Sequence, residues 1–226
     1  MKKKHFLFYI LVVTLLLPLN VMSAENAKRY DWKLKKDKDG VKTFSRFMKH
    51  SSGKEFRAVA VIDYPIEVLL EVIIDVASYP KWMPDVLEAT ILKEFHKGLE
   101  RGNYYVHIVY DGIWPVKNRD IVMESIPKTD WDKGISVIKL KKLDTFPVPL
   151  KKGIVRVKDF ASEFKFEYLA RDKTKVTFTT YVDVGGKVSP RLATIQTGSV
   201  PHKTLRNMAR VAADPKYYEA AVRDYF

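Results

Sequence analysis

The chain contains no cysteine among its 226 residues. Disulfide bonds, thiol nucleophiles and cysteine-ligated metal sites are therefore excluded, and the fold must rest on packing alone. The chain also has no internal repeat, no low-complexity stretch and no linker longer than a loop. These absences and the length predict one domain, large enough to bury a substantial core or a core that contains a cavity.

Motifs for enzyme chemistry are also scarce. The five histidines show neither H-x-x-x-H nor H-E-x-x-H spacing, so the sequence indicates no metal site. Residues 198–201 do not form a G-x-S-x-G nucleophile motif, and no Ser-His-Asp order stands out. Gly185 and Gly186 follow a predicted strand but lack the further glycines of a dinucleotide-binding loop. We therefore expect no catalytic residues, no metal and no cofactor.

A basic and then apolar segment opens the chain. Lysines 2–4 precede an apolar run over 6–19, and the small residues Ser23 and Ala24 lead into polar sequence. This pattern predicts a secretory signal peptide over 1–24, because the run is shorter than the roughly 20 residues that span a bilayer. We expect an exported protein, periplasmic or secreted, which is membrane-anchored in the alternative case that the segment is not cleaved.

Positive charge dominates the chain, whose formal net charge is +13. Cleavage after residue 24 would remove three lysines and no acidic residue, which leaves +10. This charge fits a solvated surface or attraction to anionic lipid headgroups, whereas scattered lysines in an exported protein argue against nucleic acid. We predict a monomer that makes transient contact with an anionic membrane surface. The candidate contacts are Lys139, Lys141 and Lys142, or Lys151 and Lys152 beside 146–150.

Hydrophobic periodicity predicts an α+β domain in which an antiparallel meander dominates, because the connections are too short for crossover helices. Strands are predicted near 41–48, 55–62, 86–95, 103–111, 119–126, 134–142, 153–169 and 174–184, after a charged lead-in over 33–40. Pro65 opens a predicted helix that ends by Ser78. Its apolar face carries Ile66, Leu69, Leu70, Ile73, Val76 and Ala77, and its polar face carries Glu67, Glu71 and Asp75.

The C-terminal part of the chain predicts helices. Ser189 is a natural N-cap with Pro190 next to it, and the helix should reach about Ala213 with a kink or break at Pro201. A last short helix should follow. Residues 192–199, the first half of the long helix, are small and partly polar. Such residues leave space over an aromatic sheet face, where a ligand could bind.

Strand parity predicts which face of the sheet is apolar. Polar residues such as His107, Asp120 and Glu124 should face outward, which leaves large apolar residues inside. The inward sets are Tyr104, Val106, Ile108 and Tyr110; Ile121, Met123 and Ser125; Phe164, Phe166 and Tyr168; and Val176, Phe178, Thr180 and Val182. An ordinary core filled by the C-terminal helix competes with an internal apolar cavity, and the small residues at 192–199 favour the cavity.

Several motifs occur in an order and spacing that resemble one known family. They are W-P-x-x-N-R-D at 114–120, D…Y-x-x-W at 75–82, G-x-x-R-V at 153–157, and Gly185-Gly186 through Pro190 followed by Val200-Pro201 and 205–210. With the strand at 40–46, these segments are similar to START domains, the steroidogenic-acute-regulatory-related lipid-transfer family. The resemblance covers nearly all of the chain after residue 24.

The resemblance implies a helix-grip fold, in which a curved antiparallel β-sheet wraps around a long C-terminal α-helix and encloses an internal apolar cavity. It implies one START-like lipid-binding domain over 25–226 that binds and carries a single lipid or other hydrophobic molecule without catalysis. A polyketide cyclase or aromatase that uses the same cavity is the enzymatic alternative, with Tyr104, Tyr110 or Arg119 as acid–base groups.

The family's ligand contacts carry over only in part. In phosphatidylcholine-binding members, aromatic residues at the positions of Ile108, Ile121 and Phe160 contact the headgroup, and here only Phe160 is aromatic. Val106 and Ser125 stand where cholesterol-binding members have a buried acid and base. The cavity should therefore be more apolar than in either group, and the ligand class stays open.

The predicted ligand-binding residues combine inward strand positions with the small-residue part of the helix. They are Tyr104, Val106, Ile108, Tyr110, Arg119, Ile121, Met123, Ser125, Phe160, Phe164, Phe166, Phe178, Leu192, Ile195, Gln196 and Ser199. Arg119 and Asp120 are interpreted either as a clamp between a loop and the sheet or as a contact to a ligand headgroup.

Overall fold

The computed structural model describes residues 30–49, 53–97, 100–112, 116–189, 192, 194 and 198–225. The predicted signal peptide lies outside these residues. So do the Trp114-Pro115 pair of the loop motif, Pro190, and the predicted site residues Ile195 and Gln196.

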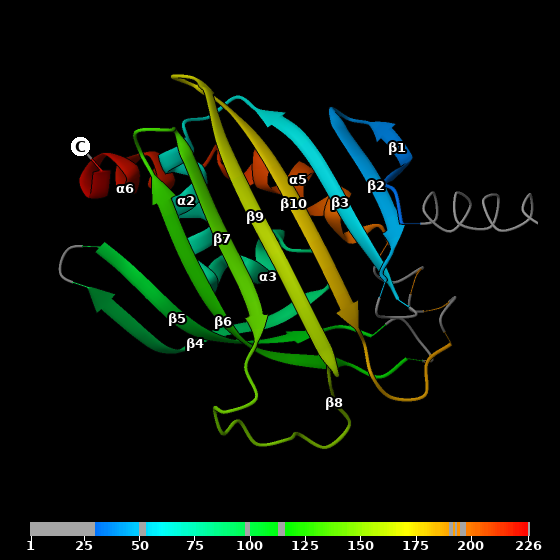
Figure 1. Cartoon of the computed structure of the whole chain (residues 1–226). Coiled ribbons are helices and arrows are strands. Elements are labelled where there is room, and N and C mark those ends of the chain that lie inside the picture. The colour runs from blue at the N-terminus through cyan, green and yellow to red at the C-terminus, as the bar shows by residue number, and fades with distance from the viewer. Residues whose placement is uncertain are drawn as a thin grey trace, which may run out of the picture.

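The described residues form one curved 10-stranded sheet with the order β1-β2-β3-β10-β9-β7-β6-β5-β4, and β8 pairs with β6 outside this path (Figure 1). The strands are β1 Lys33–Lys38, β2 Val41–Phe47, β3 Lys54–Ile62, β4 Val86–Lys97, β5 Glu100–Tyr110, β6 Arg119–Asp130, β7 Ile135–Lys142, β8 Val155–Arg156, β9 Asp159–Ala170 and β10 Lys173–Asp183. Every pair in the main path is antiparallel. The predicted meander is confirmed from β4 to β7 and for β9–β10, and β10 then closes against β3.

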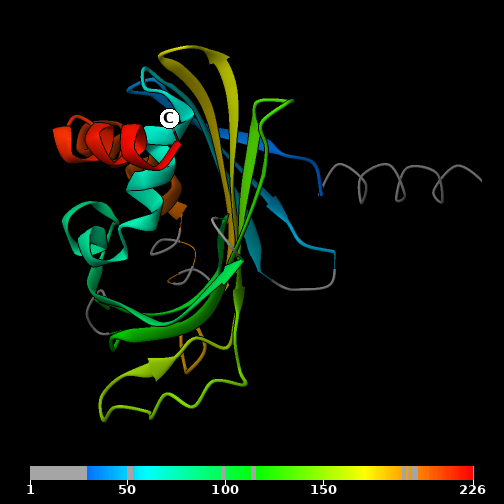
Figure 2. The same ribbon diagram turned by 90° about the vertical axis from the view of Figure 1, so that its left-hand side faces the viewer.

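Helices cover one face of the sheet, and this face is concave (Figure 2). They are α2 Ile66–Ile74, the 3-10 helix η1 Val76–Ser78, α3 Tyr79–Trp82, α5 Val200–Val211 and α6 Pro215–Tyr225. The sheet and α5 make the helix-grip fold that the sequence predicted. No helix among the described residues is both long and apolar enough to cross a bilayer.

The long C-terminal helix breaks where proline predicts. The Leu192 N–H donates to the Ser189 hydroxyl over 3.3 Å, an N-cap contact. Ser199 is a turn, and α5 begins after it with Pro201 in its first turn. Proline is tolerated there because the first turn has no partner for its missing N–H. The predicted break at Pro201 is therefore confirmed.

Aromatic and aliphatic side chains form a hydrophobic core under α2 and α5. Phe164 of β9 stacks on Phe178 of β10 with ring centroids 4.2 Å apart. Leu205 and Met208 of α5 are fully buried in the same cluster. Full burial of such a side chain contributes about 1.5–3 kcal/mol, so this cluster supplies much of the stability that disulfides cannot provide here.

The C-terminal helix α6 is fastened to α2 and η1 through polar contacts. The Tyr217 hydroxyl lies 2.9 Å from the Ser78 hydroxyl and donates to Asp75 at 3.1 Å. The Lys216 ammonium lies 2.7 Å from the same carboxylate. Burial alone would raise the pKa of Asp75, but hydrogen bonds from Lys216, Ser78 and Tyr217 outweigh it and lower that pKa. The carboxylate is therefore ionised and joins the two helices at neutral pH.

Two element boundaries differ from prediction. The charged lead-in over 33–38 is an edge strand, β1, and its exposed lysines suit an edge because they oppose pairing with other chains. The single strand predicted over 153–169 is two strands, of which β8 pairs in parallel with β6. The chain changes direction at 157–158, so the second part can enter the sheet as β9.

Three residues differ from prediction in their exposure. Tyr168 was predicted inside but is 53% exposed, because it lies near the end of β9 where no helix covers the sheet. Glu71 was predicted on the polar face of α2 but is 6% exposed, since α6 packs on this helix and places Arg223 near the carboxylate. Asp120 does face the outer side, yet it is 1% exposed because Arg156 of β8 and the segment before it cover it.

Candidate ligand cavity

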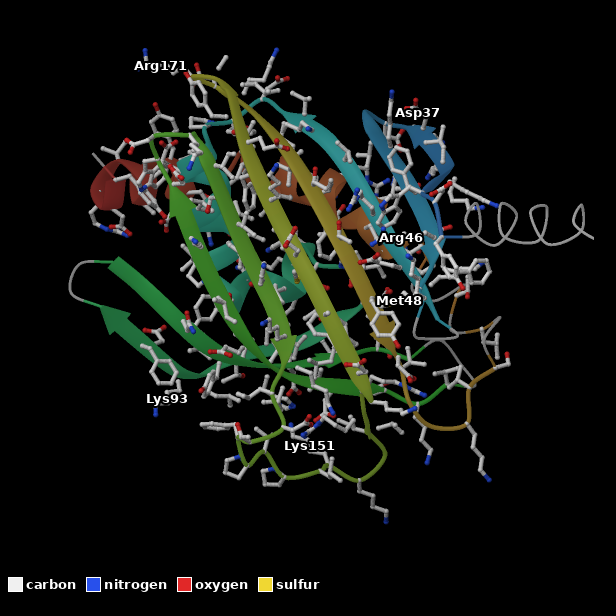
Figure 3. The ribbon with its side chains drawn as sticks, in the orientation of Figure 1. Asp37, Arg46, Met48, Lys93, Lys151 and Arg171 are labelled. Atoms are coloured by element: carbon white, nitrogen blue, oxygen red, sulfur yellow. The ribbon has the colours of Figure 1, made fainter. Side chains whose placement is uncertain are left out.

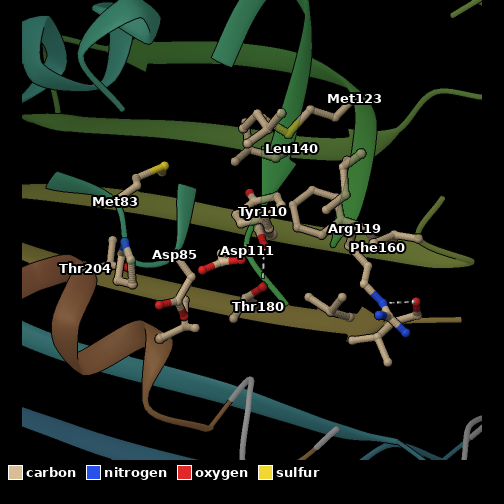
Figure 4. Close-up of a pocket in the computed structure, with 18 of the residues that line it drawn as sticks. Met83, Asp85, Tyr110, Asp111, Arg119, Met123, Leu140, Phe160, Thr180 and Thr204 are labelled. Atoms are coloured by element: carbon tan, nitrogen blue, oxygen red, sulfur yellow. Dashed lines mark hydrogen bonds between the residues drawn. The ribbon is translucent and has the colours of Figure 1, made fainter. Parts of the chain in front are cut away.

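An apolar cavity lies on the concave side of the sheet, against the N-terminal half of α5 (Figure 4). We call it the first cavity. Strands β5, β6, β7, β9 and β10 form most of its wall, and the segment after α3 completes it. The apolar lining residues are Met83, Pro84, Ile108, Ile121, Met123, Leu140, Val157, Phe160, Phe178, Val182, Val184 and Val200.

The first cavity has a volume of about 110 Å³. Pockets for drug-sized ligands usually measure about 300–1,000 Å³. The first cavity thus accommodates an apolar fragment as it stands. A whole lipid requires adjoining space or an outward movement of the neighbouring segments.

A few polar groups interrupt the apolar wall. The Ser162 hydroxyl donates to the Thr180 hydroxyl over 2.6 Å, and Thr204 of α5 borders the same space. Asp85 and Asp111 lie at the exposed edge of the cavity, joined by a 2.7 Å hydrogen bond from the Asp111 N–H to the Asp85 carbonyl (Figure 4). A few polar groups in a mainly apolar pocket can fix the orientation of a bound ligand.

Tyr110 lies among the cavity-lining side chains, and burial raises the pKa of its phenol above the ordinary value of 10.0. A general acid or base works best when its pKa is near the operating pH. Tyr110 therefore stays protonated at neutral pH. Its hydroxyl is suited to hydrogen bonding and poorly suited to proton abstraction.

Arg119 clamps a loop to the sheet beside the cavity. Its side chain is 6% exposed and donates to the carbonyl oxygens of Val184 and Gly185 at 3.4 Å and to that of Lys117. Gly185 and Gly186 have φ angles of 64° and 68°, a left-handed turn that glycine adopts without strain. Burial lowers the pKa of Arg119, but a guanidinium remains charged at any physiological pH. Arg119 therefore holds the loop in place and also forms part of the cavity wall.

A buried charge cluster lies behind the cavity, on the convex side of the sheet. Asp120 accepts hydrogen bonds from Arg156 Nε at 2.8 Å and Nη2 at 2.9 Å, and His107 Nε2 lies 3.0 Å away. Arg156 also donates to the Val148 carbonyl at 3.3 Å. Burial alone would raise the pKa of Asp120, but the hydrogen bonds from Arg156 and His107 outweigh it and lower the pKa. The cluster fixes the 143–156 segment to β5 and β6.

The predicted site residues divide into groups. Those that line the first cavity are Ile108, Tyr110, Arg119, Ile121, Met123, Phe160 and Phe178. Those that are buried beside it without lining it are Val106, Ser125, Phe164 and Phe166. Tyr104 lines a different cavity. Leu192 and Ser199 are exposed, and neither lines the first cavity.

Sequence reasoning missed several lining residues. Ser162 lies between Phe160 and Phe164 at inward parity, and Thr180 belongs to a predicted inward set, so alternation alone could have found both. Val157 and Val184 lie in irregular segments just before β9 and just after β10, where no periodic signal exists. The part of the chain that the structure describes holds no group of three or more histidine, aspartate or glutamate side chains arranged for a metal ion.

Comparisons with known proteins agree with this geometry. The chain is 30% identical over 189 residues to uncharacterized protein PA1579 of Pseudomonas aeruginosa, covering 84% of this chain and 90% of that protein. A STAR-related lipid transfer protein from Xanthomonas axonopodis is 25% identical and superposes with a TM-score of 0.71, over 80% of this chain and 98% of that chain. Human StAR-related lipid transfer protein 5 has the same fold, with a TM-score of 0.70 at 16% identity, over 91% and 99% of the two chains.

The sequence profile of the START domain matches residues 20–209. This range includes every strand, and every helix except α6 and the last two residues of α5. It therefore also contains all residues that line the first cavity. The chain belongs to the START domain family.

Proposed function

We propose that this protein binds one lipid or other hydrophobic molecule and carries it between membranes, without changing it chemically. The observation that supports this function is the first cavity, whose wall is apolar except for a few hydroxyl and charged groups. Burial of an acyl chain in an apolar cavity contributes about 0.8 kcal/mol per methylene relative to water, which offsets the burial that the chain loses when it leaves a bilayer.

Native mass spectrometry tests the binding function directly. Protein expressed in bacteria and purified without detergent should show a second mass series, heavier by one lipid, that disappears after solvent extraction. The stripped protein should then accelerate transfer of a pyrene-labelled phospholipid between vesicles. A protein that carries no lipid and takes up neither this phospholipid nor a fluorescent fatty acid contradicts the proposal.

A cavity-filling variant links uptake to the first cavity. Ile121→Trp places an indole where Ile121 now borders the space, so uptake should fall at least tenfold. Val61→Trp is the matched control, because Val61 lies on β3 and is 51% exposed. Equal uptake by both variants, with unchanged circular dichroism, would place the ligand elsewhere.

We also propose that this carrier works outside the cytoplasm, on the basis of the basic and apolar pattern over 1–24. Expression of the full chain followed by N-terminal sequencing of the product tests this. A mature N-terminus after Ser23 or Ala24 supports export, and an intact N-terminus in the membrane fraction supports the anchored alternative.

For membrane contact, we propose the segment 147–152 in preference to the lysines of β7. Leu150 is 71% exposed, and Lys151 and Lys152 follow it directly (Figure 3 labels Lys151). An exposed apolar side chain beside two cations suits an anionic bilayer, where each basic residue near the surface contributes about 1 kcal/mol. The double variant Lys151→Glu/Lys152→Glu should therefore lower the fraction of protein that cosediments with phosphatidylglycerol vesicles. The decrease should exceed that of the double variant Lys139→Glu/Lys141→Glu. The opposite ranking would move the contact to β7.

A further inference from the structure

A second cavity lies at the other end of the concave face, where α2 and α6 meet the hairpins β4–β5 and β6–β7. Its volume is about 820 Å³, against about 110 Å³ for the first cavity. Aromatic and apolar side chains form much of its wall, among them Leu70, Tyr104, Pro127, Trp131 and Tyr225. This volume lies within the roughly 300–1,000 Å³ range of ligand pockets.

Part of the wall of the second cavity lies outside the residues that the START profile matches. Asp224 and Tyr225 of α6 line it, and the START profile ends at residue 209. Tyr225 packs edge-to-face against Trp131 with ring centroids 5.5 Å apart. The helix that completes this cavity therefore follows the range that the START profile matches.

The two cavities are separated by about one layer of inward side chains. On β7, the consecutive inward residues Ile138 and Leu140 line the second and the first cavity respectively. On β6, Met123 lines the first cavity and Pro127 the second, with Ser125 between them. Residues two apart on a strand are about 7 Å apart, so this separation is short.

Ser125 is the small residue in this layer. Its cross-strand neighbours are Tyr104 on β5 and Leu140 on β7, which line the second and the first cavity. Ser125 is 0% exposed, and its hydroxyl has no hydrogen-bond partner among the described residues. Buried hydroxyls are normally bonded, so an unsatisfied one between two cavities indicates a place for a polar ligand atom.

The layer at Ser125 limits the ligand, because Ser125 is buried and lines neither cavity, so a chain passes only where this layer opens. Neighbouring strands lie about 4.8 Å apart, so an opening between Tyr104 and Leu140 suits one chain rather than two. The second cavity is the more polar one, with Glu94, Lys128 and Asp224 among its lining residues. The first cavity is small and mainly apolar. A molecule that extends through both should therefore have a bulky polar end and one thin apolar end.

We propose that a single-chain amphiphile, such as a fatty acid or lysophospholipid, occupies both cavities at once. Its polar head lies in the second cavity, with its innermost polar atom at the Ser125 hydroxyl, and its chain continues into the first cavity. This inference rests on the proposed lipid-binding function. It adds the ligand class and a second compartment that α6 completes.

Photocrosslinking with two forms of a 16-carbon fatty acid tests the arrangement in the full-length protein. One form carries a diazirine at the chain end and the other carries it next to the carboxyl group. The chain-end probe should label peptides containing Met123 or Phe160. The head-proximal probe should label peptides containing Trp131 or Tyr225.

The outcomes separate this inference from the proposed function. Labelling of the first cavity by both probes overturns the inference and leaves lipid binding intact, and so does the reverse orientation. Absence of specific labelling, with the pyrene-labelled phospholipid still taken up, overturns the inference alone. Absence of labelling together with no uptake of that phospholipid contradicts lipid binding itself.

Variants of the second cavity give an independent measure. Trp131→Ala removes a wall residue that is 49% exposed, so the fold should persist while the affinity for the 16-carbon acid falls about tenfold. Affinity for an 8-carbon acid should fall by a similar factor, because its head occupies the same compartment. Tyr218→Ala is the matched control, an aromatic on α6 that is 52% exposed and does not line the cavity. Unchanged affinity in Trp131→Ala would overturn the inference.

Discussion

Arg119 and Asp120 are neighbours in the chain, yet they belong to opposite sides of the sheet. Arg119 borders the first cavity on the concave side and donates to carbonyl oxygens of the loop after β10. Asp120 lies on the convex side, where Arg156 and His107 surround its carboxylate. The concave side is mainly apolar and partly hollow, whereas the convex side is held at this point by a buried charge cluster.

This difference assigns ligand binding to the concave side and structural support to the convex side. A mainly apolar, hollow wall can accept ligands of various shapes, because burial of apolar surface has no direction. A bidentate pair such as Arg156–Asp120 fixes one geometry, because both hydrogen bonds must be made together. We infer that the convex cluster keeps the strands in place while the concave side adapts to its ligand.

The largest effect should follow from removing packing on the concave side. Phe164→Ala deletes a ring that is 0% exposed and stacked on Phe178, so the free energy of unfolding should fall by about 3–5 kcal/mol. Urea denaturation followed by circular dichroism measures this loss. Phe164→Leu, which keeps most of the volume, should lose under about 1.5 kcal/mol. Equal losses in both variants would mean that stacking, not volume, dominates.

A loss of similar or slightly smaller size should follow from breaking the convex cluster. Asp120→Ala leaves Arg156 and His107 without their acceptor, and removing one partner of a buried pair typically costs about 3–5 kcal/mol. The partial exposure of Arg156, at 24%, places the expectation at the lower end of that range. Asp144→Ala is the control, because the Asp144 side chain is 74% exposed and its pair with Lys142 should contribute at most about 1 kcal/mol. Similar values for the two variants would contradict the support role.

Alternation in the sequence predicted which way the strand residues point, but not how deep or how covered they are. Tyr104 and Ile108 were both predicted inward and are both buried, yet they line different cavities. Which cavity a side chain meets depends on the positions of α2, α5 and α6, and strand parity carries no such information. Asp120 was placed on the correct face, but its burial depends on the irregular segment over 143–154, which leads into β8 and covers it.

The family motifs identified the fold better than they identified the site. The W-P-x-x-N-R-D segment led to the START fold, and Arg119 within it proves to hold a loop through backbone carbonyl oxygens. Glu71 shows the limit of a helical pattern, because its burial comes from α6, which lies beyond the matched domain. The periodicity of one helix does not show which other helix will pack on it, so this contact could not be predicted from the pattern of α2 alone.

A moderate effect should follow from removing the clamp beside the cavity. Arg119→Ala loses hydrogen bonds to the carbonyl oxygens of Val184 and Gly185, and bonds from a charged group contribute about 1.5–3 kcal/mol. Because the same side chain borders the first cavity, the exchange of a bound fluorescent fatty acid should also become faster. Stopped-flow displacement measures the exchange rate. The control is Arg46→Ala on β2, which removes the ion-pair partner of Glu55 on β3 and should leave exchange unchanged (Figure 3 labels Arg46).

The smallest effect concerns the pH dependence of the convex cluster. The pKa of Asp120 is lower in the folded protein than in the unfolded chain, where it is about 3.9. The carboxylate therefore contributes its full stabilisation above that unfolded value, and the contribution is lost as the pH falls through the folded pKa. Asp120→Asn removes this titration while keeping an acceptor for Arg156. Urea denaturation at pH 6 and pH 3 should show that the wild type loses more of its stability than the variant does. Equal acid sensitivity would mean that other carboxylates, such as Asp75 between α2 and α6, carry the acid response instead.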